Sequence, residues 1–337
     1  KFIIKYKMDG VEILGWLPGH EDLAKVYCES ACLVMPSFSE GGPRVTLEAM
    51  ACETAVISTP VGIMKEVIRD GENCLQTGWS AAEIAEKMMF VLKEPDKTRA
   101  IAKAGQRSVK EFEYHKAIKF YAESYLNLHV ARRRRVMKKL FYILPEYEKN
   151  TSTHFGYNVE LLDEIAKETD VFLFIEKGER PEYSRIQKIY VGKFRFILFR
   201  ILERFFVFGA ARLCGYRDFY SHYAYLSASI AGLICRLSFG RLWFWHCEMR
   251  GEYETKGCNL CGLGDKITKD WPFRFVLRAC NTLMTCSKEM KKYYASAFHV
   301  PQEKIKVLPN WVDTKKLMPR KRKPGNTVLF LHWLSPR

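Results

Sequence analysis

Short apolar runs rich in β-branched residues alternate with helix-like stretches along most of this chain, and this alternation restricts the fold more than any other feature. In the first part we predict strands at residues 11–14, 32–35 and 55–58, with helices between them and a long helix at about 115–130. Alternating strands and helices build βαβ units, whose strands lie parallel in one sheet. The first part therefore predicts an α/β domain.

The alternation starts again after a run of four arginines at residues 132–135. Met137 is followed by two lysines and an apolar run, which is typical of a protein start and a first strand. Beyond it we predict helices at 157–168, 224–237 and 288–298, and strands at 170–175, 242–245, 282–286, 306–308 and 328–331. The whole chain thus predicts the α/β class, with two Rossmann-like domains whose parallel sheets are flanked by helices.

The composition excludes some classes of protein. Apolar residues make up 48% and charged residues 27%, which is the balance of a globular protein. The formal net charge of +16 predicts attraction to polyanions, namely nucleotide diphosphates, anionic lipids or nucleic acid. The basic clusters at 132–139 and 315–323 lack interleaved aromatic residues, so we expect no nucleic-acid partner.

The eleven cysteines lie mostly in apolar runs, which indicates buried thiols. Their odd number and irregular spacing argue against a disulfide framework and predict a reducing compartment, so we expect a cytoplasmic protein. Cys258 and Cys261 form a close pair which, with His246 and Cys247 upstream, leaves zinc as an alternative. We otherwise expect no metal and no cofactor.

The longest apolar stretch, residues 194–209, is interrupted by charged residues, whereas a membrane span needs about 20 nearly uncharged ones. Two interpretations remain open. This stretch is either a helix on an anionic membrane, which would make the protein peripheral on the inner face, or a core helix with a basic rim formed by Arg195, Arg200 and Arg204.

The most specific motif lies at residues 36–51, where a Gly-Gly loop follows a predicted strand and a helix opens at about Pro43. Free backbone amides at a helix start suit a phosphate or a sugar hydroxyl, and open α/β sheets bind ligands at the carboxyl ends of their strands. Glu40 in the loop and Glu48 in the helix would both lie at that edge. Alternatively, Glu48 is an exposed helix residue and Glu40 only interacts with the helix dipole.

The two glutamates are separated by seven residues, and Ala-Met-Ala follows the second. This pattern resembles the donor-site motif of the retaining glycosyltransferases of family 4, which have the GT-B fold, and the resemblance extends over about residues 11–112. It implies that Glu40 holds donor-sugar hydroxyls, that the loop amides contact sugar and diphosphate, and that Glu48 binds the ribose. The implied donor-binding residues are Glu40, Gly41, Gly42, Glu48, Gly15 and Thr46.

Residues 138–334 resemble the other half of the same fold, the N-terminal acceptor domain. The strongest segments are 281–290 and 304–313. His246, at the end of a predicted strand, matches a histidine that lies near the reacting sugar in relatives, which implies a catalytic role; a structural role is the alternative. By the same resemblance, His222 and Asn310 belong to the acceptor side.

This sequence departs from the family pattern at several places, among them Ala55, where proline is usual. Glu53 stands where a glycine usually follows the motif helix, so we expect that helix to be less well capped. Trp311 replaces the glycine of the family's Pro-Asn-Gly-Val-Asp segment. Trp333 replaces an arginine of the diphosphate-binding loop, and the sequence stops before the lysine that usually closes it.

The resemblance predicts four segments: residues 1–131 as a C-terminal donor-binding half that is incomplete at its start, 132–136 as a basic linker, 137–322 as an N-terminal acceptor-side half, and 323–337 as the start of a second donor domain. We favour a piece of a tandem protein, because about two βα units of the donor sheet are absent. A circular permutation is the alternative, and it requires Glu40 and His246 to line one cleft.

From these features we expect a glycosyltransferase of the hexosyltransferase type. It would move a sugar from a nucleotide-diphosphate donor to a hydroxyl of a glycan or lipid-linked acceptor, in glycan, glycolipid or cell-envelope polysaccharide synthesis. The alternative is a non-catalytic, basic, membrane-surface module that keeps the GT-B fold. In the tandem arrangement this chain alone has no complete donor site.

Overall fold

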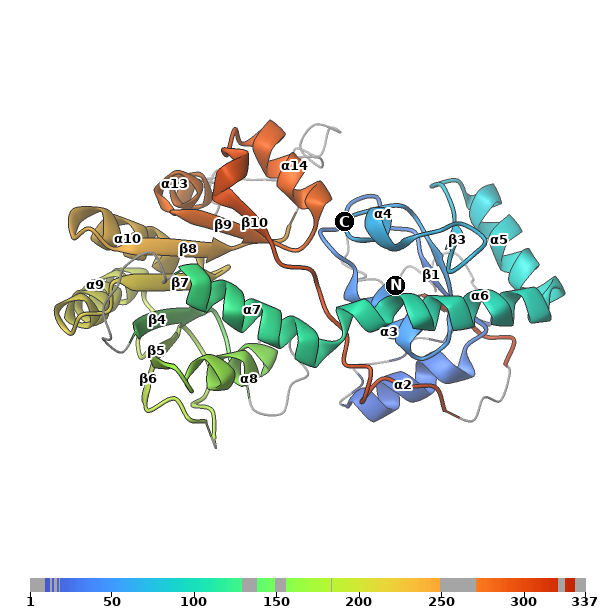
Figure 1. Cartoon of the computed structure of the whole chain (residues 1–337), viewed down its shortest axis with the longest axis horizontal. Coiled ribbons are helices and arrows are strands. Elements are labelled where there is room, and N and C mark those ends of the chain that lie inside the picture. Colours follow the sequence, from blue (N-terminus) through green and yellow to red (C-terminus); the bar gives the residue numbers. More distant parts are fainter. Residues whose placement is uncertain are drawn as a thin grey trace.

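The computed structural model describes residues 10–12, 14, 17, 19–128, 138–148, 156–182, 184–248, 271–320 and 325–330. In this part of the chain, the strands form two separate sheets, and every strand pairing within them is parallel. Helices flank each sheet, and the two resulting domains lie side by side (Figure 1). The predicted α/β class with two Rossmann-like layers is confirmed.

The first domain is built on the sheet β11-β1-β2-β3. The first three of its strands in chain order are short, and β1 and β2 are buried along their whole length, as expected for central strands of a parallel sheet. Its elements are α2 (His20–Glu29), β1 (Cys32–Met35), α3 (Arg44–Ala51), β2 (Ala55–Ser58), α4 (Met64–Val67), β3 (Leu75–Gln76), α5 (Ala81–Lys93), α6 (Pro95–Ser108) and the 3₁₀ helix η1 (Val109–Phe112).

The first domain contains one prediction that is wrong. Val11, Glu12 and Leu14 belong to no strand, and Val11 and Leu14 are 45% and 46% exposed. A β-branched run forms a strand only where a neighbouring strand or a core covers it. The position beside β1 is instead taken by β11 (Val328–Phe330), whose Leu329 pairs in register with Leu33.

The strand β11 was expected to start a further domain. In the structure it completes the sheet of the first domain, although the whole second domain separates it from β1 in sequence. The backbone amide of Ala31 also donates to the carbonyl of Thr327 at 2.7 Å, which extends the contact by one residue. A strand near the start of the described chain and the strand at its end therefore lie side by side in one sheet.

The second domain is built on the sheet β10-β9-β8-β7-β4-β5-β6. The elements after the first domain are α7 (Tyr114–Leu128), β4 (Lys138–Leu144), α8 (Gly156–Ile165), β5 (Thr169–Ile175), β6 (Lys188–Val191), α9 (Ile197–Leu213), β7 (Asp218–His222), α10 (Tyr225–Leu237), β8 (Arg241–Trp245), α13 (Trp271–Ala279), β9 (Thr282–Thr285), α14 (Lys288–Ala297), η3 (Gln302–Lys304) and β10 (Ile305–Val307). Strands β6 and β7 were not predicted; the others in this domain were.

The helix α7 runs from the first domain onto the second (Figure 1). Ile118 and Tyr121 are buried in the aromatic core of the second domain, and the Tyr121 hydroxyl donates to the carbonyls of Leu308 and Pro309. The sequence places this helix in the segment 1–131, but its packing joins it to the second domain. The linker 132–136 and Met137 lie outside the described residues.

The helix α9 divides into two faces. Glu203, Arg204, Phe208 and Ala211 are buried against the second domain, whereas most apolar side chains of its other face are exposed. Arg204 is fully buried beside Glu176, so it does not belong to a basic rim. In the part of the chain that the structure describes, α9 included, no helix is long and apolar enough to cross a membrane.

Candidate functional site at the junction of the two domains

The Gly41–Gly42 loop joins the carboxyl end of β1 to the start of α3. The Thr46 hydroxyl donates to the Pro43 carbonyl at 2.6 Å, which fixes the first turn of the helix. Gly62, with φ of +52°, supports the loop from below: a Cβ on it would come within 2.4 Å of the Glu40 and Gly41 carbonyl oxygens. A glycine is therefore required at position 62 both by backbone conformation and by space.

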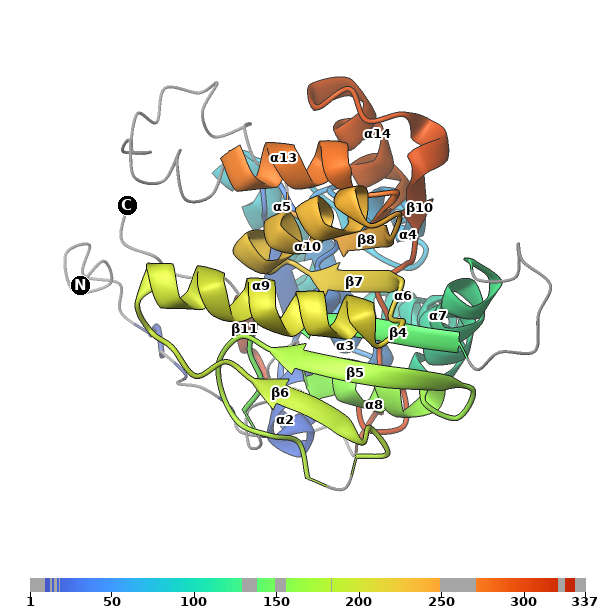
Figure 2. The same cartoon turned by 90° about the vertical axis from the view of Figure 1, so that its left-hand side faces the viewer.

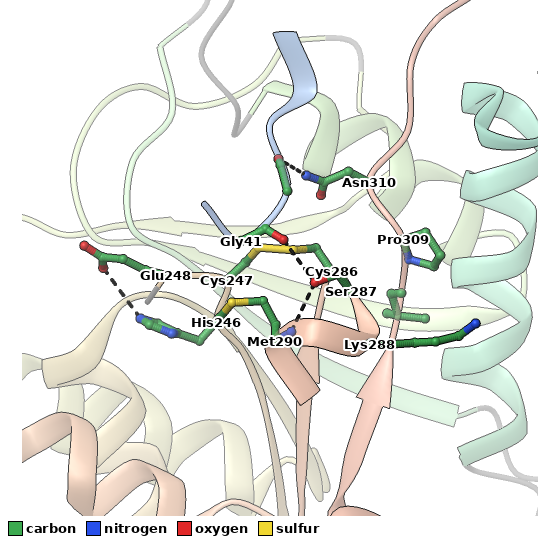
Figure 3. The surroundings of a disulfide bond; sticks show 12 residues. Gly41, His246, Cys247, Glu248, Cys286, Ser287, Lys288, Met290, Pro309 and Asn310 are labelled. Carbon is green, nitrogen blue, oxygen red and sulfur yellow. Dashed lines mark hydrogen bonds and ion pairs between the residues drawn. A yellow bond between two sulfur atoms is a disulfide. The ribbon is translucent and has the colours of Figure 1, made fainter. Parts of the chain in front are cut away.

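The loop is in direct contact with the second domain (Figure 3). The Ser287 hydroxyl donates to the Gly41 carbonyl at 3.1 Å, and the Asn310 amide donates to the Gly42 carbonyl at 2.6 Å. A Cβ on Gly41 would lie 2.4 Å from the carbonyl oxygen of Cys247. Only glycine allows the two domains to approach this closely here.

Glu48 is buried, with 7% of its surface exposed, so the alternative of an exposed helix residue is wrong. The Tyr27 hydroxyl donates to one of its carboxylate oxygens at 3.2 Å, and the Arg44 guanidinium donates to the other at 3.2 Å. Burial, and then the neighbouring Glu48 carboxylate, raise the pKa of Tyr27 well above its usual value. Glu48 is thus a buried acceptor with neutral and cationic donors beside it.

Arg44 links this carboxylate to the second domain. Its guanidinium lies 4.4 Å from the centre of the Trp311 ring, and that ring packs at 4.5 Å on Tyr114. A cation over an indole face is attracted by the ring quadrupole. In the sequence, Trp311 stands out only as a departure from the family pattern and Arg44 not at all, because no spacing signal connects two residues so far apart.

Ion pairs between α4 and the start of α14 lie beside the same junction. Lys65 contacts the Glu289 carboxylate at 2.6 Å, and the backbone amide of Lys288 donates to Glu66 at 2.7 Å. Both side chains of the Lys65–Glu289 pair are partly exposed, so the pair contributes little to stability. These contacts join α4 of the first domain to α14 of the second, but they add little to the free energy of unfolding.

His246 follows β8 and is fully buried. One ring nitrogen, Nε2, is 2.7 Å from the Tyr225 hydroxyl, and the other contacts the Tyr294 hydroxyl. Its ring also packs at 4.6 Å on Phe273. The histidine therefore lies among aromatic residues next to Cys247, and the catalytic role that the resemblance implies stays a prediction.

The other predicted site residues lie in different places: one at the junction, one buried in the second domain, and the rest outside the described residues. Asn310 lies at the junction and contacts the donor-side loop, although the sequence assigned it to the acceptor side. His222, at the end of β7, is buried and stacks on Trp245 at 5.5 Å. Gly15, Cys258 and Cys261 lie outside the described residues, so the zinc alternative is untested.

The structure brings the Glu40 side of the chain and the His246 side to one junction. Gly41, next to Glu40, lies against Cys247, next to His246. The permuted arrangement requires this relation, and the tandem arrangement, which we favour from the sequence, does not predict it. In this chain the two domains, completed by β11, pack as one unit.

Comparison with known proteins agrees with these two domains. The model of group 1 glycosyl transferases matches residues 1–108, and the model of glycosyltransferase family 4 matches residues 157–316. An uncharacterized glycosyltransferase of Methanocaldococcus jannaschii is 29% identical over 118 residues, which cover 35% of this chain and 33% of the relative.

Two further relatives have more specific names. An alpha-maltose-1-phosphate synthase of Mycolicibacterium smegmatis is 34% identical over 106 residues, or 29% of this chain and 27% of the relative. A D-inositol 3-phosphate glycosyltransferase of Streptomyces coelicolor is 33% identical over 119 residues, or 35% of this chain and 26% of the relative. The chain thus spans a third or less of the length of these relatives. Both halves of the fold are matched and both are present in the structure, which fits a glycosyltransferase of family 4 with the GT-B fold.

Proposed function

We propose that this protein transfers a sugar from a nucleotide-diphosphate donor to an acceptor hydroxyl, and that the donor binds at the junction of the two domains. The observation that carries this proposal is the position of the Gly41–Gly42 loop. It lies at the carboxyl edge of a parallel sheet, directly before α3, and it faces the strand ends of the second sheet. Both properties are typical of sites for phosphorylated ligands.

The residues of the loop and of α3 supply the chemistry that a nucleotide sugar needs. Amides of the loop suit the diphosphate, and Arg44 brings a cation to the start of the helix. Charge that develops on the leaving diphosphate is stabilised by such preorganised donors. Glu48 would exchange the donors Tyr27 and Arg44 for ribose hydroxyls, and Glu40 would hold the sugar.

Glu48 provides the sharpest test. Loss of a buried carboxylate that accepts two ribose hydroxyls costs about 2–3 kcal/mol. In Glu48→Ala the dissociation constant of the preferred nucleotide sugar should therefore rise roughly 30- to 150-fold, measured by calorimetry with a panel of donors. Glu48→Gln retains the size of the side chain and serves to separate charge from packing.

The matched control is Glu86→Ala, which removes an exposed carboxylate from α5 of the same domain. It should leave the dissociation constant unchanged. An unchanged constant in Glu48→Ala, with the protein still folded by circular dichroism, would contradict the proposed donor site. Release of the nucleoside diphosphate by the full-length protein, with an acceptor present, separates a transferase from a non-catalytic module.

We also propose that α9 binds the second domain to an anionic membrane surface. This would make the protein a peripheral membrane protein, which is one of the two alternatives that the sequence leaves open. The support is a row of exposed apolar side chains on this helix, which lies on the outside of the second domain (Figure 2). Phe206 is 76% exposed and Leu213 is 91% exposed, and Phe239, after α10, is 95% exposed. The exposed Lys193 and Arg195 precede the helix and would attract anionic headgroups.

Flotation with vesicles tests the membrane proposal. The protein should bind vesicles that contain phosphatidylserine at low ionic strength, and salt should weaken the binding. The double variant F206S/L213S should lose most of this binding, and because both side chains are exposed, it should fold normally. Leu92→Ser, on exposed α5 of the first domain, is the control. Equal flotation of all three proteins would contradict a role for α9.

A further inference from the structure

Cys247 and Cys286 form a disulfide at the junction, with Cα atoms 6.0 Å apart (Figure 3). Trp245 of β8 pairs with Met284 of β9, and each cysteine lies two residues beyond its member of this pair. Because both strands run in the same direction with this register, the two cysteines that follow them lie side by side at the carboxyl edge of the second sheet. The sequence predicts that most cysteines are buried free thiols, whereas the structure joins this pair in a disulfide.

The disulfide forms part of the surface on which the Gly41–Gly42 loop rests. A Cβ on Gly41 would lie 2.5 Å from the Cys247 sulfur, and one on Gly42 would lie 3.1 Å from the Cys286 sulfur. Ser287, directly after Cys286, donates to the Gly41 carbonyl. The same sulfur atoms and their neighbours thus hold both loop glycines.

The other cysteines of the described chain differ from this pair. Cys235 and Cys280 lie buried in the core of the second domain, and burial raises the pKa of the Cys235 thiol to about 12 and that of Cys280 to about 11. Such thiols stay protonated and unreactive at neutral pH. Cys247 is only half-buried, whereas Cys286 is fully buried, so an external reagent meets Cys247 first.

We propose that Cys247 and Cys286 are a redox switch that sets how tightly the Gly41–Gly42 loop docks on the second domain. In forming the bond, the Cys247 thiolate attacks one sulfur of a small-molecule disulfide such as oxidised glutathione and releases one thiol. Cys286 then displaces the second thiol. The two protein thiols give up two electrons and two protons, and the oxidant becomes two thiols.

Reduction changes the shape of the contact surface. Two sulfurs that are not bonded to each other must move apart, and Cys286 has no room to move because it is fully buried. The Cys247 sulfur then has to turn, and Gly41 lies directly against it. The loop is therefore displaced from the second domain in the reduced protein. Conversely, a ligand that holds the loop in place protects the disulfide, because coupling between two sites is reciprocal.

The inference rests on the proposed function only where it concerns the donor, so the experiment has two separate measurements. Hydrogen exchange of the segment 37–43 in the whole protein, oxidised or treated with dithiothreitol, reports on the loop itself. The affinity for the nucleotide sugar found in the panel above reports on the donor. We expect reduction to speed loop exchange and to weaken donor binding, each roughly 5-fold or more.

The double variant C247S/C286S should behave like the reduced protein and should no longer respond to dithiothreitol. Cys214→Ser removes an exposed free thiol outside the junction and should respond like the unchanged protein. Exchange in β4 and β5, measured in the same samples, shows whether the double variant folds. If it does not fold, Cys247→Ala and reduction of the unchanged protein give the same comparison.

Alkylation before reduction, after equilibration with oxidised glutathione, should leave both junction cysteines unmodified. The switch is overturned if they are alkylated there, or if loop exchange is the same in both redox states. If loop exchange responds to reduction but no nucleotide sugar binds in either state, the switch stands and the proposed function fails. If a donor binds equally well in both states and loop exchange does not respond, the function stands and the switch fails.

Discussion

The two sheets of this protein reach their completed form by different routes. The second sheet is built entirely from strands that follow one another between residues 138 and 307, and a single aromatic cluster, with Trp243 and Phe141 at its centre, covers it. The first sheet takes β11 from beyond the second domain, and its two faces carry separate and smaller clusters. The sheet of the second domain thus uses only strands of its own stretch of sequence, whereas the sheet of the first domain depends on the distant strand β11.

The difference shows where the stability of each domain resides. Burial of large aromatic side chains dominates the second domain, because each such side chain removes a large apolar area from water. The strands of the first domain are short and mostly aliphatic. The pairing of one strand with its neighbour therefore makes up a larger part of the sheet here than in the second domain. Variants in each domain should therefore have unequal and separable effects.

The largest effect is expected in the second domain. Trp243 of β8 is 1% exposed, and its replacement by alanine leaves a large cavity, so Trp243→Ala should lower the free energy of unfolding by about 3–5 kcal/mol. Denaturant unfolding followed by fluorescence and hydrogen exchange measures it. Trp271→Ala, at a 69% exposed position, is the control. A similar loss in both variants would mean that the aromatic cluster does not dominate this domain.

The next effect concerns the dependence of the first domain on β11. Leu329 is 8% exposed and packs in the core beside Leu33, so Leu329→Ala should cost about 2–3 kcal/mol. Faster hydrogen exchange should appear in β1 and β2 and not in β7 or β8. Phe330→Ala, at the neighbouring 54% exposed position, should change little. Unchanged protection of β1 in Leu329→Ala would show that β11 is dispensable.

A smaller gain is expected at Glu53, after α3. Its φ of +58° lies in the left-handed region, which is unfavourable for a residue with a side chain. Glu53, which stands in place of the family's glycine, therefore destabilises this helix end. Glu53→Gly should raise the free energy of unfolding of the first domain by roughly 0.5–1 kcal/mol, seen as a higher thermal midpoint. Glu53→Ala keeps the unfavourable conformation and should give no gain; an equal gain would point to charge instead.

The smallest effect is a dependence on pH in the first domain. Burial, and then the positive charge of Lys316, lower the pKa of His20 below its usual value of 6.5. The folded protein therefore prefers neutral His20, and this contribution is complete above pH 6.5 and is lost as the pH falls below it. His20→Gln should flatten the fall in thermal midpoint between pH 7 and pH 5. If the thermal midpoint falls equally in both proteins, the pH dependence comes from groups other than His20.

The sequence predicted those parts of the fold that depend on local pattern. The apolar run Cys32–Met35 forms a buried strand as predicted, and the Gly-Gly loop with Glu48 follows from one short motif. Strand β7 was missed because Asp218, Ser221 and His222 are polar, although the structure buries all of them. Only its neighbours β4 and β8, distant in sequence, make it a strand.

The contacts between the domains were not predictable in this way. No pattern in the sequence joins Arg44 to Trp311, Gly41 to Ser287, or one cysteine to another 39 residues away. Such contacts depend on how two complete domains meet, and that is a property of their surfaces rather than of any one segment. Likewise, the apolar run at 194–209 indicated a helix but did not reveal that only one face would be covered.

The pairing of β11 with β1 also has a consequence for the order in which the protein is made. Val328 follows its partner Cys32 by 296 residues (328 − 32). At about 5–20 residues per second, a ribosome needs roughly 15–60 s to reach it. Until then β1 has no partner on one side, whereas the second domain has all its strands once residue 307 is made, 21 residues earlier (328 − 307). Until β11 is made, a nascent chain would therefore expose one apolar edge of β1, which is prone to pair with other chains.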